Sequence, residues 1–257
     1  MTSRDSDTVP PRQSPTARWH ALSGDPNSPE VLAARREALT KARGTFVDDR
    51  TVYLCDLARG KRVLDIGVVE HFIGASVAEQ WLHGKLCQVA KQCVGIDVLA
   101  DELEKLRQRG YDVRNLDLTK ARLEEKFDLI VMGEVIEHLD NPGPLLANAA
   151  AMLEQDGCLV VTTPNPWYAN VIVKNLFAGA PFSDSADHVG WYDAGTLFEI
   201  GQRNGLELYK YSGVRATSAR TIAGKALFGI APLLIAIGLN QYLFSKTIVY
   251  EFKRRWD

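Results

Sequence analysis

The stretch that decides the fold is RVLDIGVVEHFIGASVAEQWLH, residues 62–83, together with CVGID, residues 93–97. The two apolar runs have the length of short buried strands, and the segment 75–83 between them predicts a helix. A strand, a tight turn, a helix and a parallel strand place a ligand at the carboxyl ends of the strands, where the turn exposes backbone N–H groups. Asp97 ends the second run, and a carboxylate at that position suits the two hydroxyls of a ribose.

The loop after the first strand separates two classes of ligand. A dinucleotide site typically carries G-x-G-x-x-G, but this loop has only Gly67 and Gly74, and Val69 stands where a second glycine is expected. The acid inside the first strand, Asp65, favours a different interpretation. VLDIG followed by GID resembles the first two motifs of the class I S-adenosylmethionine-dependent methyltransferases. The alternative is an ordinary βαβ unit without a ligand.

This resemblance implies that S-adenosyl-L-methionine is the cofactor, and it implies which positions contact it. The matching positions are Asp65, Gly67, Val69, Asp97, Val98, Asp117, Leu118, Gly133 and Glu134. At Asp117 the family's contact to adenine has a competing interpretation, in which the carboxylate caps a helix over 119–125. The run Val69-Glu70-His71 departs from the family's usual glycine-containing loop, which predicts a narrower space beneath the methionine moiety.

Bulk composition sets the broad class of the protein. The chain has 257 residues, of which 46% are hydrophobic and 24% charged, as expected for a globular protein with a sizeable core. The net charge of −2 shows no basic field of the kind that attracts nucleic acid. The four cysteines have no C-x-x-C spacing, so they predict reduced thiols and neither a disulfide framework nor a zinc site. Without an apolar signal segment, the sequence predicts a cytoplasmic protein.

The order of elements predicts an α/β fold. Residues 1–28 are rich in proline and polar side chains and predict a disordered tail, and 29–59 predict helices that cap the cofactor site. Residues 60–257 alternate strands with helices, which predicts a doubly wound, Rossmann-like, mostly parallel sheet. The family resemblance adds an antiparallel pair of strands at the sheet edge, with an apolar insertion over 216–245 between them.

A second dense motif, GEVIEHL over residues 133–139, follows the fourth predicted strand. TTPNP at 162–166 and DHVGWY at 187–192 lie downstream. Together they resemble the E-x-x-E-H pattern of a methyltransferase subgroup that includes quinone-biosynthesis O-methyltransferases, small-RNA 2′-O-methyltransferases and glycan-cluster enzymes. The resemblance covers residues 60–215, and a Trp-Leu-His and a Gly-Tyr-Asp elsewhere in it favour a sugar or glycolipid acceptor.

Three roles remain open for this motif. Methyl transfer is an in-line displacement that requires a positioned acceptor and removal of its proton. His138 and His188, with Glu137 beside them, are therefore the candidate catalytic residues. Alternatively, Glu134, Glu137, His138 and His188 ligate a divalent cation such as magnesium or manganese. In the third interpretation these side chains only orient the loop.

The third informative stretch is residues 226–239, which contain no charged or polar side chain. It is too short for a confident membrane span, and arginine and lysine residues flank it. A helix lying on the inner face of the membrane against anionic lipid has this composition, and so does a dimer interface or a substrate lid that extends to residue 244.

The sequence therefore predicts an S-adenosylmethionine-dependent methyltransferase that acts on oxygen of a small polar or lipid-linked acceptor such as a glycan. One alternative is a metal-dependent RNA 2′-O-methyltransferase, which the near-neutral net charge disfavours. Another is a cofactor-binding module without catalytic activity, which the presence of Asp65, Gly67, Asp97, Glu134 and His138 disfavours.

Overall fold

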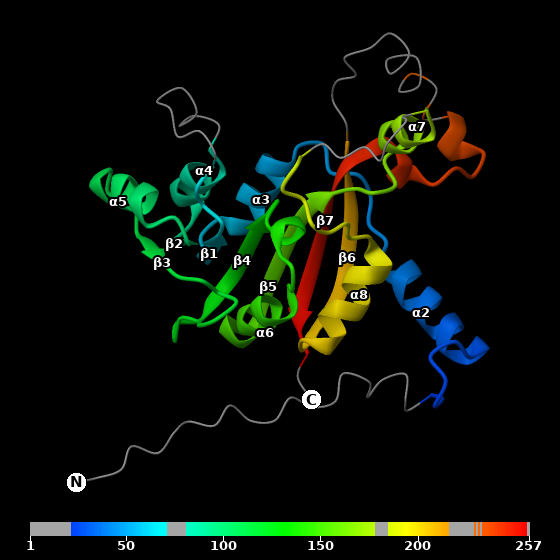
Figure 1. Cartoon of the computed structure of the whole chain (residues 1–257), viewed down its shortest axis with the longest axis horizontal. Helices are drawn as coiled ribbons and strands as arrows, with labels where there is room; N and C mark the ends of the chain where they lie inside the picture. The colour runs from blue at the N-terminus through cyan, green and yellow to red at the C-terminus, as the bar shows by residue number, and fades with distance from the viewer. Residues whose placement is uncertain are drawn as a thin grey trace.

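A computed structural model describes residues 22–70, 81–177, 185–215, 229, 231 and 233–255. Its centre is a seven-stranded sheet in the order β3-β2-β1-β4-β5-β7-β6, with helices packed against both faces (Figure 1). The strands are β1 (Arg62–Ile66), β2 (Gln92–Asp97), β3 (Val113–Asn115), β4 (Phe127–Gly133), β5 (Leu153–Pro164), β6 (Leu206–Arg215) and β7 (Ser245–Arg254). The predicted α/β class, with its mostly parallel sheet, is confirmed.

Pairing within the sheet separates a parallel body from an antiparallel edge. Strands β1 to β5 are all parallel, while β7 is antiparallel to both β5 and β6. The β6–β7 pair at the edge confirms the arrangement that the family resemblance implied. Parallel strands need cover on both faces, which is why β4 is an almost continuous apolar run.

Alternate residues of the central strands enter two different cores. The helices are α2 (Pro29–Ala42), α3 (Arg50–Ala58), α4 (Leu82–Val89), α5 (Ala100–Gln108), α6 (Gly143–Met152), α7 (Ala169–Phe177) and α8 (Ala194–Arg203). Leu64 and Ile130 join one buried cluster that packs against α6 and α8. Val63 and Leu129 join a second cluster, which packs against α3 and α4 on the opposite face.

Local signals explain where several helices begin. The Ser28 side chain accepts a hydrogen bond from the N–H of Val31, and Pro29 occupies the first turn of α2, as predicted. Asp49 caps α3 in the same way through the N–H of Val52. Asp193 caps α8 through the N–H of Thr196.

Two predicted helices differ from the described structure, and one helix of the structure had not been predicted. The helix predicted over 75–83 lies mostly outside the described residues, and the described helix α4 begins at Leu82 and continues to Val89. No helix forms over 119–125, because Asp117 closes a short turn there. The helix α7 (Ala169–Phe177) was not predicted.

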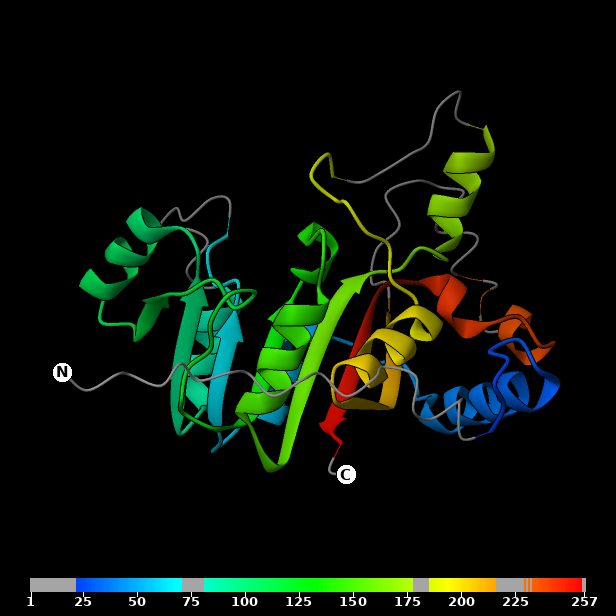
Figure 2. The same ribbon diagram turned by 60° about the horizontal axis from the view of Figure 1, so that its bottom comes forward.

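The parallel strands bring the predicted site residues to one edge. β1, β2, β4 and β5 end at Ile66, Asp97, Gly133 and Pro164, and their carboxyl ends share one side of the sheet. Figure 2 shows α7 standing beyond the tips of these strands. This edge is where a doubly wound sheet binds its ligand.

Residues 233–236 form a short helical segment, which is followed by the 3-10 helix η2 (Gln241–Phe244) and β7. The first 21 residues of the tail predicted over 1–28, and residues 226–228, 230 and 232 of the apolar stretch, lie outside the described residues. Within the described residues, no helix is long and apolar enough to cross a membrane.

Candidate functional site

The turn after β1 requires glycine for two reasons. Gly67 has a φ of 77°, a left-handed backbone conformation that side chains disfavour. A Cβ at this position would also lie only 2.4 Å from Cγ2 of Val135, in the loop after β4. The Gly67 N–H donates to the carbonyl of Ile96, which ties the turn to β2. The loop after β1 and the loop after β4 are therefore in close contact.

Asp97, the residue predicted to bind the ribose, ends β2. Its Oδ2 accepts a hydrogen bond from the N–H of Val69 at 2.9 Å. Its Oδ1 accepts from the N–H groups of Val98 at 2.7 Å and Leu99 at 3.1 Å. The carboxylate thus orders the loop after β1 and its own loop together, and Val98 beside it is exposed.

Asp65 lies elsewhere. It is buried in the middle of the sheet, and its Oδ2 is 3.1 Å from Nδ1 of His83 on α4. Asp65 thus contacts a histidine, and its carboxylate does not reach the carboxyl edge of the sheet. Its contact with the cofactor stays a prediction, and this geometry does not support it.

Asp117 and Leu118 follow β3. Oδ1 of Asp117 accepts hydrogen bonds from the N–H and the hydroxyl of Thr119, at 3.0 and 2.6 Å. A hydrogen bond from Lys120 and those from Thr119 lower the pKa of Asp117 to about 2. Leu118 is buried in the larger core. The carboxylate caps a turn, where the competing interpretation expected a helix.

Glu134 directly follows β4 in an unusual conformation. With a φ of 57°, it is the non-glycine residue with positive φ among the described residues. Its Oε1 lies 3.2 Å from Nη1 of Arg50 and 3.3 Å from the hydroxyl of Thr162, which donates to it. The backbone N–H of Glu134 donates to the carbonyl of Thr162. A strained backbone held by several bonds is typical of functional loops. Gly133 precedes it, packed close to Leu82.

Glu137 is the buried acid of the site. It lies on the 3-10 helix η1 (Ile136–His138), and only 1% of its surface is exposed. The hydroxyl of Thr163 donates to its Oε2 at 3.0 Å, while Oε1 has no hydrogen-bond partner. Burial raises the pKa of the Glu137 carboxyl to about 7. A carboxyl with this pKa can accept or donate a proton near neutral pH.

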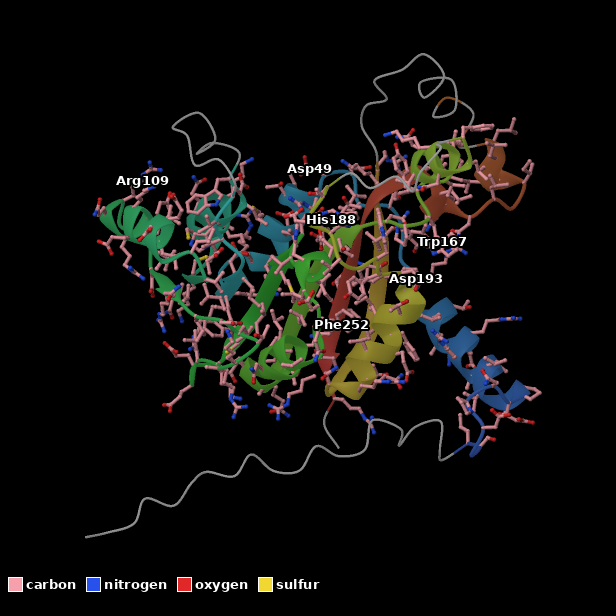
Figure 3. All side chains as sticks on the ribbon, viewed as in Figure 1. Asp49, Arg109, Trp167, His188, Asp193 and Phe252 are labelled. Carbon is pink, nitrogen blue, oxygen red and sulfur yellow. The ribbon has the colours of Figure 1, made fainter. Side chains whose placement is uncertain are left out.

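The backbone of Glu137 also positions the second histidine. Its carbonyl accepts hydrogen bonds from the N–H groups of Val189 and Gly190. This pairing draws the loop before α8 across the ends of β4 and β5, where Figure 3 places His188. Residues about 50 positions apart in the sequence therefore meet at one point of the sheet edge.

The two histidines lie against each other. The rings of His138 and His188 are 4.9 Å apart in an edge-to-face arrangement. Nδ1 of His138 is 3.1 Å from Oδ2 of Asp187, while Nδ1 of His188 is buried without a partner. One ligand atom each of Glu137, His138 and His188 lies within 4.8 Å of the others. Three of the four predicted metal-ligand positions are thus brought together, and Glu134 pairs with Arg50 outside this group.

Several residues of the site had not been predicted. Arg50 on α3 reaches Glu134 and Thr162, and Asp187 orients His138. Asn165 lies in the predicted T-P-N motif, but its amide holds the carbonyls of Tyr242 and Ser245 together. Asp187 opens the DHVGWY motif, but its contact with His138 was not predicted, and Arg50 carries no local signal for its contacts, because both act across long separations in the chain.

Comparison with known proteins gives a family and several relatives. A family model described as a methyltransferase domain matches residues 37–211. The ubiquinone biosynthesis O-methyltransferase of Bradyrhizobium diazoefficiens is 31% identical over 162 residues, which cover 58% of this chain and 60% of the relative. The corresponding enzyme of Glaesserella parasuis is 29% identical over 140 residues, 49% of this chain and 53% of the relative. The chain thus spans between half and two thirds of the length of these relatives.

Solved structures support the fold. A methyltransferase of Thermotoga maritima, described as dependent on S-adenosylmethionine, aligns with a TM-score of 0.53 at 16% identity and covers 87% of this chain and 92% of its own. Another S-adenosylmethionine-dependent methyltransferase, from Archaeoglobus fulgidus, has a TM-score of 0.50 at 18% identity and covers 86% of this chain and 94% of its own. At these identities the similarity concerns the fold.

Proposed function

The chain belongs to the methyltransferase domain family, whose class I members use S-adenosylmethionine, and from this we propose that it methylates a hydroxyl oxygen of a small polar or lipid-linked acceptor. The relatives named above are O-methyltransferases of ubiquinone biosynthesis, which supports oxygen as the acceptor atom. The acceptor is either a phenol of the quinone type or a sugar hydroxyl, and both need the same proton removal.

One observation carries this proposal: Glu137, His138 and His188 meet at the sheet edge that also holds Asp97. In the proposed reaction Asp97 accepts hydrogen bonds from the ribose hydroxyls and fixes the cofactor in place. When bound, S-adenosylmethionine would supply the methyl group and would end as S-adenosylhomocysteine. The residues of the loop after β4 would position the acceptor hydroxyl and remove its proton.

Glu137 and His138 have complementary parts in the proposed proton transfer. His138, held by Asp187 at 3.1 Å, presents its other ring nitrogen to the acceptor hydroxyl. Glu137, with a pKa near 7 and one unpartnered oxygen, takes up a proton within the same cluster. Because a sulfonium methyl donor would need no proton on its leaving group, the site needs a base more than it needs an acid.

A second candidate mechanism uses a divalent cation in the same cluster. Two of its buried polar atoms, Oε1 of Glu137 and Nδ1 of His188, lack hydrogen-bond partners, which fits donors that await a ligand. A mixed set of oxygen and nitrogen donors suits magnesium or manganese. When bound, such an ion would lower the pKa of the acceptor hydroxyl, while Asp187 would still orient His138.

Replacement of the histidines tests the assignment. We expect His138→Ala and His188→Ala each to lower turnover by roughly 10²–10⁴-fold, because a general base typically contributes that much. The Kd of each variant for S-adenosylhomocysteine, measured by calorimetry, should stay within about two- to three-fold of the wild-type value, which is the usual variation between similar variants. Glu104→Gln, which changes an exposed acid of α5, serves as the control.

The choice of acceptors and the metal content decide between the alternatives. Wild-type protein is assayed with catechol-type phenols, with lipid-linked glycans and with RNA ends, with and without a chelator. If the chelator abolishes activity and manganese restores it, the metal mechanism is correct and the general-base mechanism is not. Unchanged turnover in both histidine variants would remove this cluster from the mechanism.

A further inference from the structure

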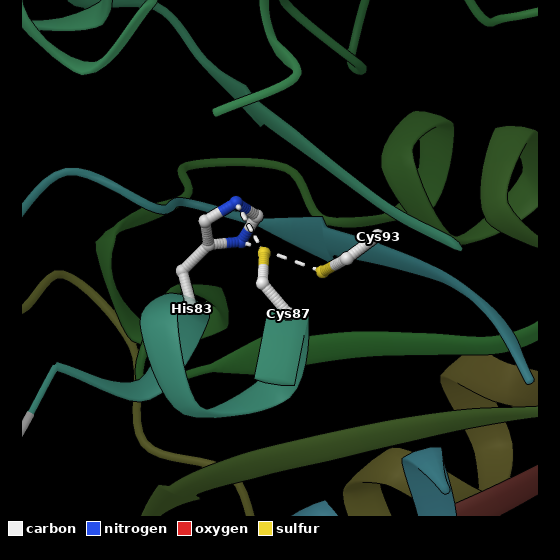
Figure 4. A group of neighbouring side chains, drawn as sticks. All are labelled: His83, Cys87 and Cys93. Carbon is white, nitrogen blue, oxygen red and sulfur yellow. Dashed lines mark hydrogen bonds between the residues drawn. The ribbon is translucent and has the colours of Figure 1, made fainter. Parts of the chain in front are cut away.

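A second cluster of metal-binding side chains lies away from the proposed active site, between α4 and β2 (Figure 4). It consists of His83, Cys87 and Cys93. His83 and Cys87 are four residues apart on α4, so they project from one face of the helix, and Cys93 faces them from the start of β2. No C-x-x-C spacing announces this group, which explains why the sequence predicted no zinc site.

The distances within this cluster are close to those of a metal site. Sγ of Cys87 lies 3.4 Å from Nε2 of His83, and Sγ of Cys93 lies 3.9 Å from Nδ1 of the same ring. The ligand atoms of the three residues all lie within 4.8 Å of one another. Ligand atoms around a tetrahedral zinc ion are about 3.5–3.8 Å apart, given bonds of about 2.1 Å to nitrogen and 2.3 Å to sulfur. Shifts of about 1 Å bring all three onto one ion.

Asp65 supplies the outer partner that metal-bound histidines require. Its buried carboxylate is 3.1 Å from Nδ1 of His83, so it accepts the Nδ1–H and leaves the lone pair of Nε2 on the side of Cys87. A carboxylate that orients a histidine in this way is typical of metal centres. This arrangement also explains why Asp65 faces away from the cofactor edge.

From this geometry we infer that His83, Cys87 and Cys93 bind one zinc ion, or another thiophilic divalent cation, with Asp65 as the orienting partner of the histidine. Among the described residues the protein supplies three ligands, which leaves the fourth tetrahedral position for water. His83 is almost fully buried and both thiols are half-buried. An ion bound by them would hold α4 against β2, close to the turn after β1.

The opposing interpretation is that His83 is an ordinary core histidine satisfied by Asp65. That interpretation accounts for the contact between Nδ1 and Asp65, but it gives no reason for two thiols against the same ring, with Cys87 near Nε2 and Cys93 near Nδ1. The two thiols are also in hydrogen-bond contact with each other. Two sulfur donors next to a nitrogen donor select zinc over magnesium or calcium, which prefer oxygen.

Titration of the full chain tests this inference. The protein is purified under a phosphine reductant, stripped of metal and titrated with zinc against a chromophoric chelator, and separately with cobalt(II). We expect one zinc ion per chain that is bound at least ten-fold more tightly than by Cys87→Ser or Cys93→Ser. Cobalt should give the charge-transfer absorption of thiolate ligands. Cys55→Ser, which removes a half-buried thiol of α3, should bind like wild type.

The cobalt spectrum keeps the test decisive in two difficult cases. A metal ion at Glu137, His138 and His188 would show no thiolate band, so it cannot be mistaken for this site. If the serine variants fail to fold, the wild-type spectrum alone decides, because its intensity reports the thiolate ligands. Absence of the thiolate band, or a band that Cys87→Ser and Cys93→Ser retain, would overturn the inference.

Discussion

At the scale of single residues, two aspartates of one βαβ unit have different environments. Asp97 is the last residue of β2 and accepts hydrogen bonds from backbone N–H groups of two loops. Asp65 pairs in register with Gly95, two positions before Asp97, so it lies on the same face of the sheet but short of the carboxyl edge, where it reaches His83 on α4. How far each carboxylate lies from the carboxyl edge decides what it contacts, which is why the motif alone could not assign both carboxylates.

Glu137 allows a prediction about pH at this scale. Its folded pKa of about 7 lies above the ordinary value of 4.5, so between these two values the folded chain keeps a proton that the unfolded chain has lost. Its contribution to the free energy of unfolding therefore falls as the pH rises from 4.5 to 7, by up to about 3 kcal/mol. In urea unfolding, we therefore expect the free energy of unfolding of Glu137→Gln to rise relative to that of wild type as the pH increases from 5 to 8.

The same variant should lose activity. Glutamine cannot accept the proton, so turnover should fall by roughly 10²-fold or more at pH 8, where the wild-type carboxylate is ionised. Glu104→Gln, which changes an exposed acid on α5, should alter neither quantity. A difference in the free energy of unfolding between Glu137→Gln and wild type that is the same at pH 5 and pH 8 would contradict the raised pKa.

At the scale of elements, the strands were predictable and some connections were not. Continuous apolar runs mark buried parallel strands, and β1 and β2 lie on the two runs that predicted them. The stretch 119–125 was ambiguous because an aspartate caps a turn and a helix by the same hydrogen bond. The helix α7 was missed because most of its apolar residues are exposed, so burial in the core does not mark it.

The meeting of Glu137, His138 and His188 could be predicted only in part. Their residue types and their position after buried strands were visible in the sequence. Their contact depends on the carbonyl of Glu137, which binds the N–H groups of Val189 and Gly190 across a long connection. The arginine at position 50 and the cysteine pair at α4 and β2 depend in the same way on tertiary packing, for which the sequence has no local pattern.

The turn after β1 gives a prediction at the element scale. Gly67→Ala places a methyl group 2.4 Å from Val135 in a backbone conformation that also disfavours alanine. Gly110 has a similar positive φ of 89°, but nothing lies within 4 Å of its missing Cβ. Gly110→Ala is therefore a matched control for strain alone, which costs about 1–3 kcal/mol.

We expect Gly67→Ala to be destabilised more than Gly110→Ala, because it must also displace the loop after β4. Chemical unfolding measures the difference directly. Equal losses in the two variants would mean that the turn and the loop after β4 are not packed together as described.

At the scale of the whole molecule, apolar and basic side chains meet on the face formed by α2 and the segment before β7. Leu233 and Ile237 are 66% and 71% exposed, which argues against an ordinary core role in the monomer. Residues farther along the same segment help to line a pocket of about 330 Å³ together with side chains of α2 and β6, and its lining residues are Leu32, Arg35, Arg36, Leu39, Thr40, Arg43, Tyr211, Asn240 and Tyr242. Exposed apolar residues next to clustered arginines suit an anionic lipid surface.

Membrane contact through residues 226–244 stays a prediction, and vesicle flotation tests it. We expect the protein to float with phosphatidylserine vesicles, to be released in part by salt, and to lose flotation in a Leu233→Ser, Leu234→Ser, Ile237→Ser variant. Neutralising Arg35, Arg36 and Arg43 should weaken binding, whereas Lys105→Gln with Arg107→Gln on α5 should not. A salt-insensitive dimer without flotation would assign the surface to a second copy of the chain.

The measurement that tests the central claim most directly is a calorimetric titration with S-adenosylhomocysteine. One molecule should bind per chain, and Asp97→Ala should bind it at least ten-fold more weakly, because two charge-assisted hydrogen bonds to the ribose are lost at about 1.5–3 kcal/mol each. Asp101→Ala, an exposed acid at the start of α5, should bind as wild type does, and NAD should give no heat. Binding of NAD in place of S-adenosylhomocysteine, or unchanged affinity in Asp97→Ala, would contradict the account.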